Sequence, residues 1–122
     1  MPKSDKGAAA VEFALVAMML VVLVFGIAEF GRLWFLQSNL AAAARDGARE
    51  MAVKNDASDA GDAVRDVFPL ATTVAVTPGT GACDGGGQAR VTATYDASWL
   101  TGLFGTGATI TLTGEGVMRC GG

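Results

Sequence analysis

The chain has 122 residues, of which 51% are hydrophobic and 17% charged, and its net charge is −3. This acidic balance argues against nucleic-acid binding, because phosphate neutralisation needs clustered cations. The sequence has no histidine, which excludes Ser-His-Asp and Cys-His catalysis and histidine-ligated zinc or haem. We therefore expect no enzyme active site, no cofactor, no metal and no small-molecule substrate.

Charge and composition divide the chain into three parts. Residues 1–7 form a basic leader with two Lys and one Asp. Residues 8–55 contain four acids and four bases and are predicted to form one long helix. Residues 56–122 contain seven acids, three Arg and most of the glycines. We expect this last part to be a small head domain with a short helix and a sheet. Together with the long helix, this head gives an α+β fold class.

The predicted helix begins with an apolar stretch. From Ala8 to Ala28 there are 21 residues with one charge, Glu12. As a helix this stretch would be about 31 Å long, the thickness of a bilayer core. An apolar stripe at steps of three and four continues the helix to about Val53. The stripe consists of Leu33, Leu36, Leu40, Ala44, Gly47 and Met51.

The charges that flank the apolar stretch indicate its orientation. Lys3 and Lys6 precede it, and only Arg32 follows closely, so the positive-inside rule favours a cytoplasmic N-terminus and an exported C-terminal head. An alternative is a secretory signal peptide, because Gly26-Ile27-Ala28 places small residues where a signal peptidase reads. Against it, the apolar run is long for a signal peptide, and the helical pattern continues through the supposed cut.

Glu12 is the one carboxylate inside the apolar stretch. It could lie at headgroup level and complement the helix dipole, or it could have a partner in the membrane. The basic leader ends at Gly7, and Glu12 and Phe13 follow at the fifth and sixth positions after it. This arrangement resembles a type IV prepilin processing site, in the form used by Tad (tight adherence, Flp-type) pilus proteins.

Three strings of residues extend this resemblance along the helix. They are VEFALV at 11–16, EFGR at 29–32 and AARDGAR at 43–49. In this order they resemble the TadE-like family of minor pilins or pseudopilins, although they do not separate TadE from its paralogue TadF.

The resemblance implies a function in assembly of a Tad pilus used for adherence or secretion, with a pilin-like fold. It implies that a prepilin peptidase cuts after Gly7 and leaves Ala8 as the mature N-terminus. It also implies that Glu12 pairs with the α-amino group of a neighbouring pilin-class subunit. The protein would then be a single-pass protein of the bacterial cytoplasmic membrane that can be incorporated in a surface pilus.

The residues where the helix would leave the membrane allow two interpretations. Glu29 and Arg32 are spaced to form an i,i+3 pair on the helix surface. Alternatively, together with Gly26 and Gly31, which allow close approach of another helix, they form a packing face for partner pilins. Asp46 with Arg49 and Glu50 with Lys54 are also spaced to pair.

The head is predicted to begin with a short helix. Asp56 can cap a helix from Ala57 to about Phe68, which Pro69 ends. Its acids at 56, 59, 62 and 66 complement the helix dipole. A calcium site is the alternative, but the chain has no EF-hand loop pattern.

Three alternating runs rich in Val, Ile, Thr and Tyr then predict a three-stranded antiparallel sheet. They are Thr72–Thr77, Ala89–Tyr95 and Thr109–Met118, and residues 79–87 form a glycine-rich hairpin loop between the first two. The connection Ala97–Gly107 contains apolar residues that either cover one end of the sheet or form an exposed docking patch. These residues are Trp99, Leu100, Leu103 and Phe104.

Cys83 and Cys120 are the only cysteines. Outside the cytoplasm two cysteines usually bond, and a bridge would stabilise a small head by about 3–4 kcal/mol. We therefore predict a membrane-anchored pilin or pseudopilin with a disulfide-bonded head. The alternative is an uncleaved single-pass protein that presents an extracytoplasmic head to a ligand.

Overall fold

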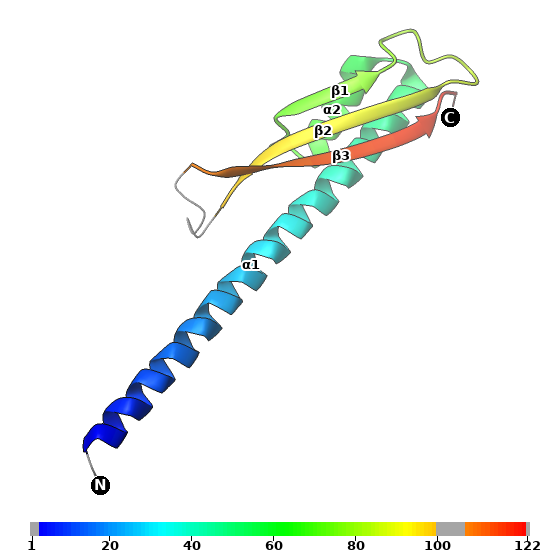
Figure 1. The fold of residues 1–122 in the computed structure, drawn as a ribbon. Helices are drawn as coiled ribbons and strands as arrows, with labels where there is room; N and C mark the ends of the chain where they lie inside the picture. The colour runs from blue at the N-terminus through cyan, green and yellow to red at the C-terminus, as the bar shows by residue number, and fades with distance from the viewer. Residues whose placement is uncertain (1–2, 100–106, 122) are drawn as a thin grey trace. The chain divides into compact units, whose positions relative to one another are not determined.

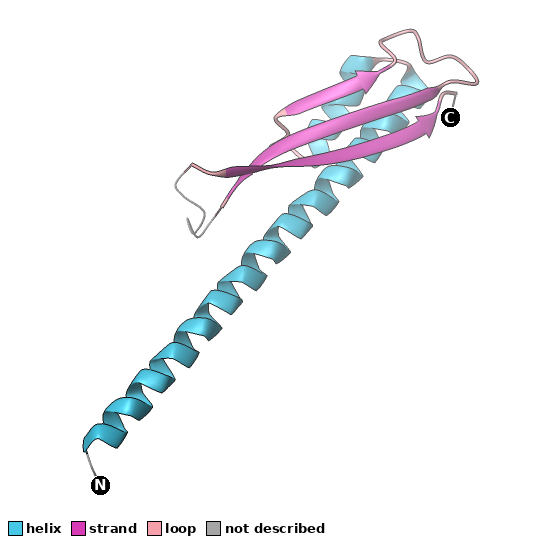
Figure 2. Cartoon of the chain, viewed as in Figure 1, coloured by secondary structure: helices cyan, strands magenta, loops and turns pink. Residues whose placement is uncertain are grey.

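The structure, a computed structural model, describes residues 3–99 and 107–121, with side chains from residue 5 onward. The described residues form two helices and a three-stranded sheet. Figure 1 shows their arrangement, and Figure 2 gives the same view by secondary structure. The elements are α1 (Lys3–Lys54), α2 (Ala57–Val67), β1 (Thr73–Thr77), β2 (Gln88–Ser98) and β3 (Thr109–Arg119). This layout confirms the predicted α+β class. The chain forms two compact units, Met1–Arg32 and Leu33–Gly122.

Helix α1 is longer than predicted at its N-terminal end. It begins at Lys3, inside the predicted leader, and ends at Lys54, one residue beyond the predicted end. Residues of high helix propensity, with no proline between Pro2 and Pro69, explain its continuity. In its last turn, Lys54 Nζ lies 3.0 Å from Glu50 Oε2. The hydrogen bond to Glu50 raises the pKa of the exposed Lys54 ammonium.

Helix α2 confirms the prediction from the Asp56 cap. The side chain of Asp56 accepts hydrogen bonds from the backbone N–H groups of Ser58 and Asp59. These bonds satisfy donors that the first helical turn leaves open.

The three strands form one antiparallel sheet in the order β1-β2-β3. Val91 at the centre of β2 pairs with Val76 on one side and Gly116 on the other. Strand β2 runs three residues beyond the predicted Tyr95 end, so Ala97 and Ser98 belong to a strand rather than to the connection. Pairing with β3 supports this extension, and the Thr111 hydroxyl donates to Asp96 at 2.7 Å. Residues 100–106 of the expected apolar connection lie outside the described residues.

The core of the second unit lies between the sheet and the two helices. Figure 1 shows α2 and the C-terminal part of α1 behind the sheet. Small alanines on α1 allow the sheet to approach it, and Phe68 and Tyr95 meet edge to face with ring centres 5.4 Å apart. The buried residues of this cluster are Leu40, Ala43, Ala44, Ala48, Val64, Phe68, Val91, Ala93, Ala97 and Leu112.

Two glycines let β3 touch the backbone of α1. A Cβ at Gly114 would lie 2.6 Å from the Leu40 carbonyl, and one at Gly116 would lie 2.4 Å from the Ala44 oxygen. Ordinary side chains cannot be accommodated at these distances. Beside this contact, the Gln37 side-chain amide donates to the Thr113 carbonyl at 2.6 Å. The alternation of β3 thus places glycine, not a large apolar residue, at the centre of its inner face.

Candidate membrane and assembly segment

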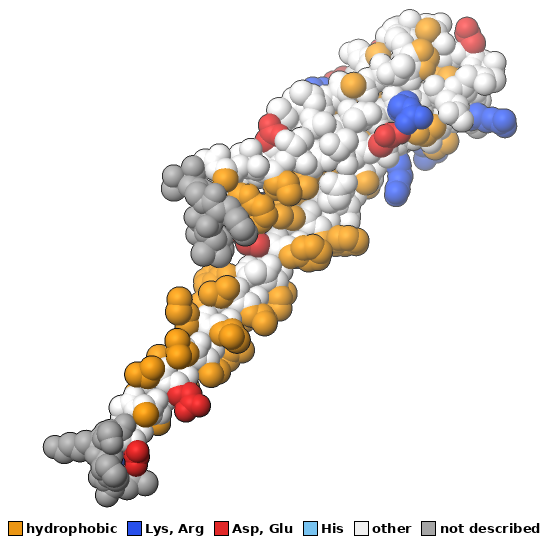
Figure 3. Space-filling model, viewed as in Figure 1, with side chains coloured by type: hydrophobic (Ala, Val, Ile, Leu, Met, Phe, Trp, Pro, Cys, Tyr) orange, Lys and Arg blue, Asp and Glu red, His pale blue; other side chains and the backbone are white. Residues whose placement is uncertain are grey.

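The first unit presents apolar side chains on all sides of α1. The large hydrophobic residues from Val11 to Ile27 are between 51% and 74% exposed, and Figure 3 shows hydrophobic side chains along this part of the helix. Such a helix in water would leave its whole apolar surface unburied. By length and composition, α1 contains one segment that could cross a membrane, and this suggests a membrane anchor.

The predicted processing residues all lie on the exposed surface of this helix. Gly7, Ala8 and Glu12 are exposed, and Phe13 is 74% exposed. Glu12 is the fifth residue after Gly7, so it lies about 7.5 Å farther along the helix axis. A Cβ added at Gly7 would meet no atom within 4 Å. Glycine is therefore not required there by the packing of the chain itself.

Glu29 and Arg32 form the predicted ion pair, with Arg32 Nη2 3.7 Å from Glu29 Oε2. The pair is less exposed than a surface pair, because Glu29 is only 5% exposed and the Arg32 side chain 26%. A carboxylate removed from water needs a compensating cation, which Arg32 supplies. Sequence spacing predicts the pairing, but burial depends on contacts that spacing does not contain.

Gly26 and Gly31 leave open surface on the same helix. A Cβ at either position would have no neighbour within 4 Å. Neither glycine is needed for packing within the described chain, which is compatible with close approach of another helix at this level. Their assignment to a packing face for partner pilins stays a prediction.

Exposed aromatic residues follow the apolar stretch, and the sequence analysis did not single them out. Phe30, Trp34 and Phe35 are between 64% and 69% exposed. Aromatic rings gather where a membrane-spanning helix leaves the hydrocarbon layer. The signal that could have found them is Trp34, which lies less than two turns after the last residue of the apolar stretch.

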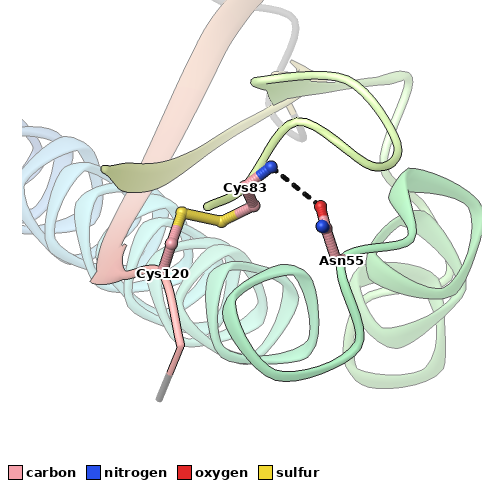
Figure 4. Close-up of a disulfide and its surroundings, with 3 residues drawn as sticks. All are labelled: Asn55, Cys83 and Cys120. Atoms are coloured by element: carbon pink, nitrogen blue, oxygen red, sulfur yellow. Dashed lines mark hydrogen bonds between the residues drawn. A yellow bond between two sulfur atoms is a disulfide. The ribbon is translucent and has the colours of Figure 1, made fainter. Parts of the chain in front are cut away.

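The predicted cysteine pair forms a disulfide in the head. Cys83 and Cys120 are bonded, with their Cα atoms 5.4 Å apart, and both are buried. Figure 4 shows the bridge beside Asn55, whose side-chain oxygen accepts a 2.8 Å hydrogen bond from the Cys83 N–H. The bridge joins the loop between β1 and β2 to the residue after β3.

Asn55 is a second residue whose importance the sequence analysis missed. Its φ of 56° lies in the left-handed region, where Asn is the best tolerated residue after Gly. Its N–H donates to the Met51 carbonyl and its carbonyl accepts from Gly81. The signal that could have found it is an Asn directly after the last turn of a helix and before an N-cap Asp.

The alternative calcium interpretation of the α2 acids has no support in the described residues. Within 3–99 and 107–121 no group of three or more His, Cys, Asp or Glu side chains could hold a metal ion. Asp56 instead serves as the N-cap, and Asp59 lies in the first helical turn, where it complements the helix dipole.

A family model described as TadE-like protein matches residues 7–49. The match begins at Gly7, ends at Arg49 and contains all three strings on which the predicted resemblance depends. It confirms that resemblance for this part of the chain and suggests a protein associated with the Tad pilus. No curated protein and no solved structure matches the chain.

Proposed function

We propose that this chain is a minor pilin or pseudopilin, a subunit that takes part in assembly of a Tad-type pilus from the cytoplasmic membrane. The observation that carries the proposal is the position of Gly7, Glu12 and Phe13 at the start of an exposed apolar helix, within the TadE-like match. An assembly function also agrees with the absence of histidine from the sequence.

In this proposal a prepilin peptidase removes residues 1–7. The leader is basic and precedes the apolar stretch, so it would be held on the cytoplasmic side. Cleavage after Gly7 would convert the amide nitrogen of Ala8 into an α-ammonium group at the membrane surface. The apolar stretch would stay attached to the head, unlike that of a secretory signal peptide.

Glu12 would then bind the α-ammonium group of a neighbouring pilin-class subunit. A carboxylate in a membrane helix costs about 2.5–3.5 kcal/mol on insertion scales. An ion pair within the low-dielectric layer offsets part of this cost for both charges. Because the ammonium is at the first mature residue and the carboxylate at the fifth, pairing favours one axial stagger between neighbouring helices.

The part of α1 near its membrane exit would provide a packing surface in the same assembly. Gly26 and Gly31 would allow another helix to approach, and the Glu29–Arg32 pair would limit the charge presented to it. The head would lie outside the cytoplasm, where an oxidising environment is compatible with the Cys83–Cys120 bridge.

The mass and N-terminal sequence of the protein extracted from its native membrane test the proposal. We expect a chain that begins at Ala8. In the variant Gly7→Leu the leader should stay attached, although open space around Gly7 means that its own fold is undisturbed. Ala10→Leu, an equally exposed small-to-large change three residues away, is the matched control and should be cut normally.

Two other N-termini would each contradict the proposal. A wild-type chain beginning at Met1 or Pro2 would favour the alternative of an uncleaved anchored protein whose head binds a ligand. A chain beginning at Glu29 would identify the apolar stretch as a cleaved secretory signal.

A further inference from the structure

A groove runs along the helical layer of the second unit, between α1 and α2. Its volume is about 450 Å³. The groove combines exposed valines with an excess of carboxylates over cations: Val53, Val67, Asp46, Glu50, Asp66 and Arg49 all contribute to its lining. Val53 is 65% and Val67 45% exposed. Much of the surface of these two side chains is therefore not covered by the rest of the described chain.

Asp66 is the carboxylate of the groove most available to a partner. Glu50 already pairs with Lys54, and Asp46 lies one turn from Arg49. Asp66 is exposed, and no cation of residues 5–99 or 107–121 lies within ion-pair distance of it. The groove thus offers an exposed charge beside an exposed valine.

At one end of the sheet, arginines rather than carboxylates lie beside an exposed valine. Arg90 faces Val117 across the β2–β3 pair, and Arg119 is two residues farther along β3. Residues two apart on a strand share a face, so these three side chains form one patch on the outer surface of the sheet. Val117 is 43% exposed, and Figure 3 shows Lys and Arg side chains gathered towards this end of the sheet. We call these three residues the basic patch.

Arg119 is the available cation of the basic patch. Arg90 is paired with Glu115 across the strands, whereas Arg119 is exposed. Within the described ranges no carboxylate is close enough to pair with Arg119. The basic patch therefore mirrors the groove, with an exposed arginine beside an exposed valine.

The groove and the basic patch lie on opposite sides of the second unit. On α1 the core residues Ala44 and Ala48 face the sheet, and by helical periodicity Asp46 and Val53 point away from it. The basic patch is on the sheet surface that faces away from the helices. The two surfaces cannot meet within one chain, but they can meet between two copies.

We propose that the basic patch of one copy docks in the α1–α2 groove of a second copy, with Arg119 against Asp66 and the exposed valines in contact. Because the two surfaces differ, this contact is head to tail and can repeat from copy to copy, which generates rings or open stacks rather than two-fold symmetric dimers. The inference rests on the proposed function, in which membrane-anchored heads lie side by side during assembly.

Site-specific photo-crosslinking of the purified full-length protein in mild detergent tests this contact. A photoreactive benzoylphenylalanine replaces Val67 in the groove, and we expect covalent dimers in which the label has reacted near Val117 on the second copy. Arg119→Glu should lower the dimer yield about fivefold, because attraction becomes repulsion. Adding Asp66→Arg to the same chain should restore the yield, because the pair is then reversed.

Matched charge reversals control for altered net charge. Arg65→Glu changes the net charge as Arg119→Glu does, and Asp96→Arg changes it as Asp66→Arg does. Arg65 is on α2 but does not line the groove, and Asp96 is near the far end of the sheet's outer face. Both control variants should give the wild-type dimer yield. The unfolding temperature of each variant in detergent reports that it is folded.

Three results would overturn the inference: no dimer, a cross-link outside the basic patch, or a yield that the double variant does not restore. Its failure is distinct from failure of the proposed function, which the N-terminal mass of the membrane protein decides. A protein that begins at Ala8 but gives no head cross-link would support the proposed function and contradict the proposed contact. A cross-linked protein whose leader is intact in the native membrane would support the proposed contact and contradict the proposed function.

Discussion

At the scale of single residues, several glycines and one asparagine allow close contacts or unusual backbone conformations that other residues would not. Gly114 and Gly116 admit the α1 backbone, and Gly47 admits Val64 from α2, with an added Cβ 2.5 Å from its Cγ2. Asn55 takes a left-handed conformation and hydrogen-bonds the loop that carries Cys83. These positions are not detected by apolar periodicity, because glycine and asparagine carry no hydrophobic signal.

Gly116→Ala tests the close contact between β3 and α1. The added methyl group would lie within 2.6 Å of backbone atoms of Ala44 and Arg45, which cannot move without shifting the helix. Overpacking of this kind costs about 1–3 kcal/mol. For a domain of this size we expect the unfolding temperature of the full-length protein in detergent to fall by about 10 °C.

Gly79→Ala is the control for this substitution. Gly79 lies in the loop after β1, and a Cβ there would meet nothing within 4 Å. Its unfolding temperature should be close to that of the wild type. Equal unfolding temperatures for the Gly116 and Gly79 variants would contradict the tight contact that the structure shows.

At the scale of elements, local patterns predict most of the fold. The Asp56 cap defines the start of α2, and β-branched alternation locates all three strands to within three residues at each end. Among the strands, the largest difference is the C-terminal extension of β2 through Ser98. It depends on pairing with Thr109–Thr111, which is distant in sequence and therefore absent from any local pattern.

A substitution of Glu12 in the first helix can distinguish pilus assembly from removal of the leader. Glu12→Ala should still be cut after Gly7, because the change is five residues from the cleavage bond. It also removes a charge from the membrane, which favours insertion. The variant should nevertheless fail to assemble into pili, because the neighbouring α-ammonium loses its partner. Mass spectrometry of the membrane protein and isolation of sheared pili measure the two steps.

Two further variants define the role of the Glu12 charge. Glu12→Gln keeps hydrogen bonding but not charge, and should be nearly as defective as Glu12→Ala. Asp5→Asn removes a carboxylate from the leader, which the mature subunit lacks, and should assemble normally. If Glu12→Ala supports wild-type pilus levels, Glu12 only complements the helix dipole at the membrane surface.

At the scale of the whole molecule, the candidate site is easier to predict than the contacts of the head. The proposed processing and membrane residues form a continuous stretch of sequence, so residue type and spacing suffice to propose them. The contact of β3 with α1 depends on residues far apart in sequence. The groove and the basic patch likewise combine two elements each, and appear only once the sheet and helices are packed.

The disulfide and the hydrogen bonds close to it link segments of the head that are distant in sequence. The disulfide closes a 37-residue separation between Cys83 and Cys120. Close to it, the Gly121 N–H donates to the Ala52 carbonyl at the end of α1. The bridge thereby joins the first loop of the sheet and the end of the last strand to the same turn of the helix. Opening it would free three segments together rather than one.

Cys83→Ser should therefore destabilise the head by about 3–4 kcal/mol in the loop-entropy model, and Cys120→Ser by a similar amount. The double variant should be no less stable than either single variant, because the first substitution already opens the bridge. Denaturant unfolding of the full-length protein in detergent and the rate of proteolysis of the head measure these effects. In the wild type, neither thiol should react with an alkylating reagent until reductant is added. Additive losses in the double variant would show that the cysteines stabilise the head by separate packing contacts, and two reactive thiols in native material would show that the bridge does not form.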